Sequence, residues 1–251
     1  MEQIIIYTLV AVIVYLTHVQ EGITGFGCTV LALPFITLLL GLQTAVPMLV
    51  INAWVLTVYI TWESRQKIVW SEYARIFILA ALGLPIGMWM SSRLPEDILK
   101  FILAGFMILV GIHGLWKQTA KQRNNPTVNP TTRFLSSLLL PIGGLIHGAF
   151  GSGGPLAVIY ATQTLTDKTA FRGTLCAVWV TLNTIIVSRW IVTKSLNAHI
   201  LKVAAFALPF TVIGMIMGNH WHYRMDEILF RKLVYTVLVL AGITLALSVI
   251  V

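Results

Sequence analysis

The sequence has few charged residues. Only 10% of its 251 residues are charged, whereas 57% are hydrophobic, and the mean hydropathy is +0.86. Soluble domains carry about 25% charged residues. A chain with so few charges cannot cover a water-facing surface, so most of its surface must face lipid. This excludes a soluble globular domain and predicts an all-α polytopic membrane protein.

Cysteine is also scarce. Cys28 and Cys176 are the only two, and each lies inside or beside an apolar run. They cannot form a disulfide framework or a CxxC metal site, and we interpret both as small buried hydrophobic residues. The run HWHYR holds His220, His222 and Arg224 and resembles a metal cluster only superficially; we interpret it as a loop in water. We therefore expect no metal and no cofactor.

The net charge of +8 does not form a single basic face. Lys and Arg fall mostly in short gaps between apolar runs, as in the loops of membrane proteins. A nucleic-acid-binding protein gathers these residues on one face, so we expect the lipid bilayer and not nucleic acid as partner. The first twenty residues lack a basic start and a cleavage site, and we interpret them as a transmembrane helix. We expect a multi-pass protein of a bacterial inner membrane. The sequence leaves open whether it forms a homo-oligomer.

Ten apolar runs follow one another along the chain. They cover residues 4–20, 24–41, 45–62, 76–92, 98–116, 134–150, 154–166, 173–192, 199–218 and 229–251. A spanning helix needs about 20 residues. The run from Gly154 is short and the run from Thr24 contains Pro34, so both are expected to be broken helices of the kind that line transporter sites.

The chain divides near its middle into two similar halves. The polar segment 117–133 is predicted to be a cytoplasmic linker between a first membrane repeat, 1–116, and a second, 134–251. Gly22, Gly25 and Gly27 lie 126 positions before Gly148, Gly151 and Gly153. With small offsets allowed, Trp54 also matches Trp179. Each half holds about five runs, and this odd number predicts inverted repeats, with residues 63–75, 167–172 and 219–228 on the same side as the linker.

Each half carries a glycine motif, EGITGFGCT from Glu21 and HGAFGSGGP from His147. Glycines allow positive φ, and Pro155 suits the first turn of a new helix. The free amides and dipole of such a helix start attract anions. Two facing starts would form a site for a small anion. Close packing of helices explains the same glycines, and the sequence leaves both interpretations open.

Polar and aromatic residues in the apolar runs complete the candidate site. The candidates for substrate binding are Gly22, Thr24, Gly25, Gly27, Asn52, Trp54, Gly148, Gly151, Ser152, Gly153, Gly154, Trp179 and Asn183. Glu21, His147 and Arg189 are candidates for proton coupling or for pairing with the anion, because ionisable groups at membrane depth are costly and usually functional. For Asn52 and Asn183 the alternative is interhelical hydrogen bonding, and for Arg189 it is contact with the membrane surface.

The stretch GxxGSGGPLAV from Gly148 resembles the second glycine motif of the sulfite exporter TauE/SafE family. GITGFGCTVLALP, from Gly22 to Pro34, resembles the first. The sequence departs from the pattern at Cys28, where the family often has glycine, and at Tyr160, where it often has proline. The resemblance implies a duplicated transporter of sulfite, sulfonates such as taurine or sulfoacetate, or other small anions.

We therefore predict a secondary transporter that exports a small anion by alternating access, with proton coupling as a hypothesis. An anion channel with the same site is the main alternative. An intramembrane enzyme would have to use Ser152 with His147, and GAFGSGG is neither a P-loop nor a GxSxG elbow, so no enzyme is expected. A structural subunit without a substrate is the third alternative.

Overall fold

The computed structural model describes residues 2–121, 130–165, 167–221 and 227–250. In these ranges it contains eleven α-helices, one 3₁₀ turn and no strand, which confirms the all-α prediction. In chain order they are α1 (Glu2–Thr24), α2 (Cys28–Leu40), α3 (Leu42–Glu63), η1 (Arg65–Lys67), α4 (Trp70–Arg93), α5 (Glu96–Lys121), α6 (Pro130–Ser137), α7 (Leu139–Phe150), α8 (Gly154–Thr164), α9 (Lys168–Val192), α10 (Ala198–Trp221) and α11 (Glu227–Ile250).

Seven segments in the described ranges are long and apolar enough to cross a membrane. They are α1, α3, α4, α5, the stretch formed by α6 and α7, α9 and α10. Their outward faces carry exposed apolar side chains such as Leu82, Leu109 and Ile216, as a lipid-facing surface requires. The chain is thus a multi-pass membrane protein.

Helices α2 and α8 are too short to span a bilayer, with 13 and 11 residues. Both follow a break closed by a left-handed glycine. After α1, Gly25 has φ 80° and its N–H donates to the Glu21 carbonyl at 2.6 Å. After α7, Gly151 has φ 65° and donates to the His147 carbonyl at 2.7 Å. Since each motif ends one helix and starts a short one, the predicted broken helices are present in both halves.

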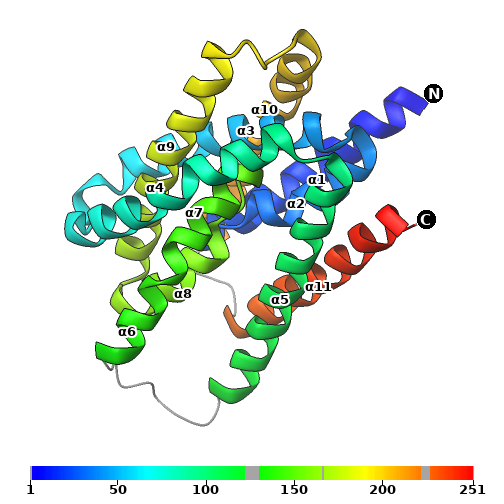
Figure 1. Cartoon of the computed structure of the whole chain (residues 1–251). Helices are drawn as coiled ribbons and strands as arrows, with labels where there is room; N and C mark the ends of the chain where they lie inside the picture. Colours follow the sequence, from blue (N-terminus) through cyan, green and yellow to red (C-terminus); the bar gives the residue numbers. More distant parts are fainter. Residues whose placement is uncertain (1, 122–129, 166, 222–226, 251) are drawn as a thin grey trace.

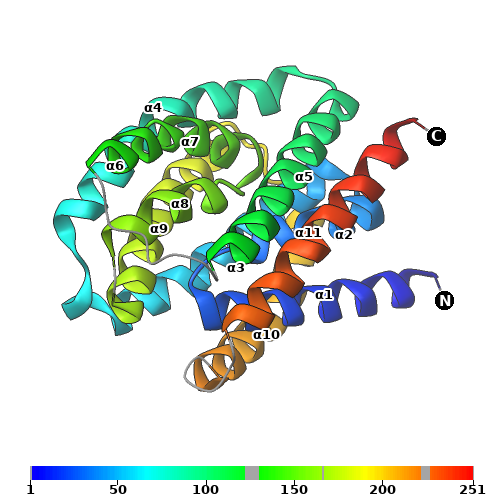
Figure 2. The same ribbon diagram turned by 90° about the horizontal axis from the view of Figure 1, so that it is seen from below.

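The helices pack in pairs drawn from opposite halves of the chain. Helix α1 packs on α10, α4 on α7, α3 on α9 and α5 on α11 (Figures 1 and 2). If α1–α5 are matched in order with α7–α11, the α1–α10 contact corresponds to the α4–α7 contact. The α3–α9 and α5–α11 contacts each join a helix to its own counterpart in the other half. Two repeats related by a pseudo-two-fold axis predict this pattern. The orientation of each half in the membrane stays a prediction.

Glycines bring the α1–α10 and α4–α7 pairs into close contact. A Cβ atom on Gly22 would lie 2.9 Å from Gly218 Cα, and one on Gly148 would lie 2.3 Å from the Leu84 carbonyl oxygen. A Cβ on Gly153 would lie 2.1 Å from the Gly143 carbonyl oxygen. Such distances leave no room for a side chain at Gly22 and Gly148, where helices cross, or at Gly153, where the second break packs against α7. Close packing was the alternative interpretation of these glycines, and their part in substrate binding stays a prediction.

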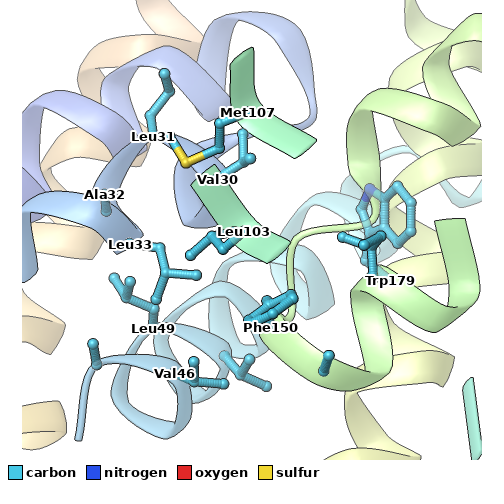
Figure 3. Packing of buried hydrophobic residues seen from close by; sticks show 14 of the residues in the cluster. Val30, Leu31, Ala32, Leu33, Val46, Leu49, Leu103, Met107, Phe150 and Trp179 are labelled. Carbon is cyan, nitrogen blue, oxygen red and sulfur yellow. The ribbon is translucent and has the colours of Figure 1, made fainter. Parts of the chain in front are cut away.

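The main apolar core lies between the two short helices and their neighbours. Side chains of α2, α3 and α5 meet Phe150, the last residue of α7 (Figure 3). Phe150 is fully buried. Because it directly precedes Gly151, this packing fixes the position of the second break.

Candidate functional site

A small pocket lies where the two breaks meet α3 and α9. Its lining residues are Glu21, Gly27, Thr29, Val30, Ala53, Thr57, His147, Gly151, Ser152, Gly154, Pro155, Trp179 and Asn183. Eight of these were among the predicted site residues. The structure therefore brings parts of both glycine motifs to one cavity.

The second-half side of the pocket is built around His147, which lies in the last turn of α7 and is buried. Its Nε2 bonds to Asn183 Oδ1 at 3.0 Å, and its ring stacks on Trp179 with 5.2 Å between centroids. Nε2 is therefore the donor to the amide oxygen. Nδ1 is buried and has no partner among the described residues, so a ligand in the pocket can supply one.

Helix α8 begins at this side of the pocket. Gly154 and Pro155, its first two residues, are part of the lining, and no side chain in the described ranges caps this helix start. Ser152 does not act as a cap, because its hydroxyl donates to the Phe150 carbonyl at 3.1 Å. The positive end of the α8 dipole is therefore available to an anion in the cavity.

The first-half side of the pocket is different, because the protein supplies its own anion there. Glu21 is buried in the last turn of α1, and its Oε2 accepts a hydrogen bond of 2.8 Å from the amide of Cys28. Cys28 is the first residue of α2. A carboxylate at a helix start satisfies both the free amide and the dipole. The start of α2 is thus already occupied.

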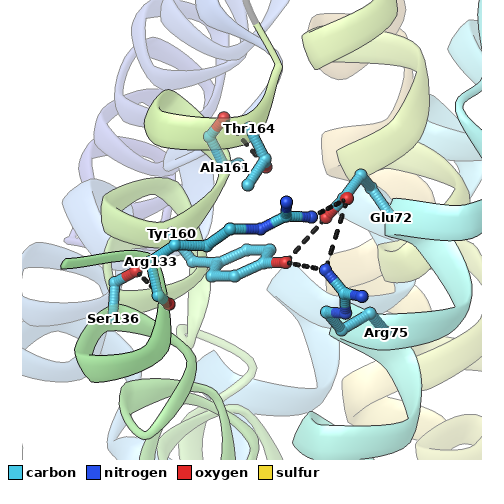
Figure 4. Close-up of polar contacts among 7 residues, drawn as sticks. All are labelled: Glu72, Arg75, Arg133, Ser136, Tyr160, Ala161 and Thr164. Atoms are coloured by element: carbon cyan, nitrogen blue, oxygen red, sulfur yellow. Dashed lines mark hydrogen bonds and ion pairs between the residues drawn. The ribbon is translucent and has the colours of Figure 1, made fainter. Parts of the chain in front are cut away.

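The far end of α8 is held by a polar cluster of Glu72, Arg75, Arg133 and Tyr160 (Figure 4). The Tyr160 hydroxyl donates to Glu72 Oε2 at 2.7 Å and accepts from Arg75 Nη1 at 3.2 Å. Glu72 also pairs with Arg75 at 3.6 Å and with Arg133. This cluster ties α8 to α4 and α6, so it fixes the direction in which the start of α8 points.

Several predicted site residues lie outside the pocket lining. Asn52 donates from Nδ2 to the carbonyls of Met48 and Ala204 and accepts from Thr211 Oγ1 at 3.0 Å. Trp54 donates to Thr184 Oγ1 at 2.9 Å. Asn52 thus forms interhelical hydrogen bonds between α3 and α10, which was its alternative interpretation.

Arg189 is also engaged elsewhere. Its guanidinium donates to the Met88 carbonyl at 2.8 Å and to Ser92 Oγ at 3.3 Å, near the end of α4. Gly25 shapes the first break without lining the pocket. The side chain of Thr24, and residues His222 and Arg224, lie outside the described residues.

Five residues of the lining were not among the predicted site residues: Thr29, Val30, Ala53, Thr57 and Pro155. Two of them, Ala53 and Thr57, could have been found by keeping the offset of 126 strict, because it matches them with the predicted residues Trp179 and Asn183. This offset matches Thr29 with Pro155, Ala53 with Trp179 and Thr57 with Asn183, all of which line the pocket. Allowing small offsets instead paired Trp179 with Trp54, which does not line it. The pocket thus holds four matched pairs, including Glu21 with His147.

Comparison with known proteins identifies the family. Residues 9–245 match the family model described as sulfite exporter TauE/SafE. The chain belongs to this family. It is also similar to the probable inner membrane transporter protein TsaS of Comamonas testosteroni, with 21% identity over 182 residues, which are 72% of this chain and 73% of that protein. No solved structure matches the chain. As a TauE/SafE member with seven candidate spans, the protein is a membrane transporter, and the family resemblance of its glycine motifs is confirmed.

Proposed function

We propose that this TauE/SafE protein is a secondary transporter that exports a small anion, a sulfur oxyanion or organosulfonate such as sulfite, taurine or sulfoacetate. The observation that carries the proposal is the uncapped start of α8, which opens into the same pocket as the unpartnered Nδ1 of His147. Backbone amides and a helix dipole hold an oxyanion without a full positive charge, so the anion can be released again.

The neighbouring side chains suit a small oxyanion. Asn183 fixes the His147 ring, and the indole of Trp179 closes one side of the cavity by stacking on that ring. A protonated His147 would donate from Nδ1 to an oxygen of the anion, and such charge-assisted bonds are about twice as strong as neutral ones.

Glu21 supplies a reason for proton coupling. It lines the same pocket, so an ionised carboxylate there repels the substrate anion, whereas a protonated one does not. Binding of the anion would then favour uptake of a proton by Glu21, and alternating access of the two halves would move both together. Export by this route requires an outward gradient of the anion that exceeds the inward gradient of protons.

Flux of sulfite, taurine and sulfoacetate in proteoliposomes tests the proposal, with and without an imposed pH gradient. We expect saturable flux of at least one anion, and faster flux when the gradient drives protons in the same direction. Flux that ignores the gradient would contradict proton coupling. A steady anion current in planar bilayers would favour a channel that uses the same site, and absence of any flux would contradict the transporter proposal for these anions.

A further inference from the structure

Arg172 is a buried arginine that the proposed mechanism does not use. It lies near the start of α9, and only 6% of its surface is exposed. Arg172, Cys176, Trp179 and Asn183 follow one another at helical spacing along one face of α9. Trp179 and Asn183 line the pocket, and Arg172 lies about 10 Å before Trp179 along the helix axis, given a rise of about 1.5 Å per residue.

The guanidinium of Arg172 is only partly satisfied. Its Nη1 donates to Asn219 Oδ1 at 2.8 Å, whereas Nε and Nη2 are buried without a partner in the described part of the chain. Nε and Nη2 lie side by side on one edge of the guanidinium plane. This edge is the fork that binds two oxygens of a carboxylate, phosphate or similar oxyanion at once. A buried charge with such an open edge is costly unless a partner arrives.

The neighbouring carboxylates do not fill this edge. Glu21 directs its Oε2 to the Cys28 amide, from which it accepts a hydrogen bond. Glu63 contacts Asn219 Nδ2 at 3.4 Å, so it reaches Arg172 only through the asparagine. None of the ion pairs within the described ranges includes Arg172.

We propose that the Nε–Nη2 edge of Arg172 is a second binding station for the substrate oxyanion, between the pocket and the start of α9. The proposal rests on the proposed function and extends it to a path along α9. Gly25 belongs to this path, because a Cβ there would lie 2.7 Å from Arg172 Cγ. The first break therefore packs directly against the arginine, and a movement of that break changes access to it. A planar fork also selects oxyanions over spherical halides.

The test compares sulfite flux into proteoliposomes for the wild type, R172Q, R172K and R65Q. Arg65 is a matched control, since it is exposed and is predicted to lie on the same side of the membrane. We expect R172Q to raise the KM for sulfite about tenfold or more and to weaken the preference for sulfite over chloride. R172K keeps the charge but loses the fork, so it should restore only part of the affinity. R65Q should behave as wild type.

A double variant separates binding from charge balance. If Arg172 only neutralises Glu21, E21Q/R172Q will have the same KM as E21Q alone, and this result would overturn the station. If Arg172 binds the anion, the KM of the double variant stays about tenfold or more above that of E21Q. Thermal unfolding checks that each variant is folded. If R172Q does not fold, the KM of R172K is the test. An unchanged KM for sulfite in R172K contradicts the station, and a raised KM supports it.

The two proposals fail differently. If the wild type transports sulfite and R172Q transports it with the same KM, only the station is contradicted. A wild-type protein that moves none of sulfite, taurine and sulfoacetate contradicts the proposed function and the station with it.

Discussion

The two halves of the pocket use the same backbone design with opposite chemistry. Each half ends one helix, α1 or α7, with a left-handed glycine and starts a short helix at the cavity. In the first half, Glu21 occupies the start of α2. In the second, His147 at the matching position bonds to Asn183 and leaves the start of α8 uncapped. Duplication alone would give two equivalent helix starts at the cavity. The side chains leave the start of α8 uncapped within the described ranges and place the Glu21 carboxyl group at the start of α2.

The far ends of α2 and α8 differ as well. At the offset of 126, Pro34 of α2 matches Tyr160 of α8. Proline has no hydroxyl to donate, whereas Tyr160 joins the cluster around Glu72 (Figure 4). Helix α8 is therefore held at the end away from the pocket by polar contacts that α2 cannot copy. A fixed α8 keeps its positive end directed at the ligand.

Among the variants that test this difference between the halves, removal of His147 should weaken substrate binding most. H147A deletes the unpartnered Nδ1 and leaves Asn183 Oδ1 without its donor. Hydrogen bonds to charged groups contribute about 1.5–3 kcal/mol, so we expect the Kd for sulfite to rise about 10- to 100-fold. Isothermal titration calorimetry measures this Kd. W54F, outside the pocket lining, should bind as wild type; an unchanged Kd in folded H147A would show that the second half does not bind the anion.

Neutralising Glu21 should remove the charge difference between the halves. Its effect on substrate binding should be smaller than that of H147A. In E21Q the amide oxygen can still accept from the Cys28 N–H, so the start of α2 keeps its partner. We expect sulfite flux that no longer responds to a pH gradient, and an affinity at neutral pH that rises about tenfold because the repulsion is gone. Flux in proteoliposomes at two external pH values measures both. Gradient-driven flux that persists in E21Q would assign proton coupling to another group.

Loss of the Tyr160 hydroxyl should lower stability by about 1–2 kcal/mol, because Glu72 loses a buried donor. Thermal unfolding of Y160F in detergent checks this value. Y59F is the matched control, since Tyr59 lies in α3 and is 49% exposed. Equal unfolding temperatures for Y160F, Y59F and the wild type would mean that the cluster does not hold α8 in place.

The smallest effect is expected for Asn52. Polar contacts between membrane helices contribute about 0.6 kcal/mol on average, and Asn52 makes its contacts away from the pocket. N52A should therefore lower the unfolding free energy slightly and leave the KM for sulfite unchanged. A KM that rises as much as in H147A would place Asn52 on the substrate path after all.

The sequence predicted the features that depend on composition and on glycine chemistry. Hydropathy located the apolar helices, and the spacing of Gly25 and Gly151 located both breaks. It did not show that the run 134–150 divides into α6 and α7, since no glycine or proline stands at Leu138. It also could not separate packing glycines from pocket glycines. Gly148 and Gly151 lie three residues apart, and only the position of α4 puts Gly148 in a helix crossing.

The sequence also did not predict which groups each polar side chain would bond to. Glu21 and His147 were found as a pair because they precede matched motifs. Whether a carboxyl group at the end of one helix reaches the start of the next depends on the turn between them. Gly27 has φ 100° in the first turn, whereas Gly153 has φ −70° in the second. Arg189 and Asn52 looked equivalent to pocket residues because hydropathy does not record which face of a helix meets a neighbour.

Selenite, an anomalously scattering stand-in for sulfite, gives the most direct test of the central claim. The experiment is an anomalous difference map of the protein crystallised with selenite at a concentration well above its Kd. We predict a selenium peak within hydrogen-bond distance of the first-turn amides of α8 and of His147 Nδ1. A peak at the start of α2 in place of Glu21, or a pocket without selenium in a protein that binds selenite, would contradict the account.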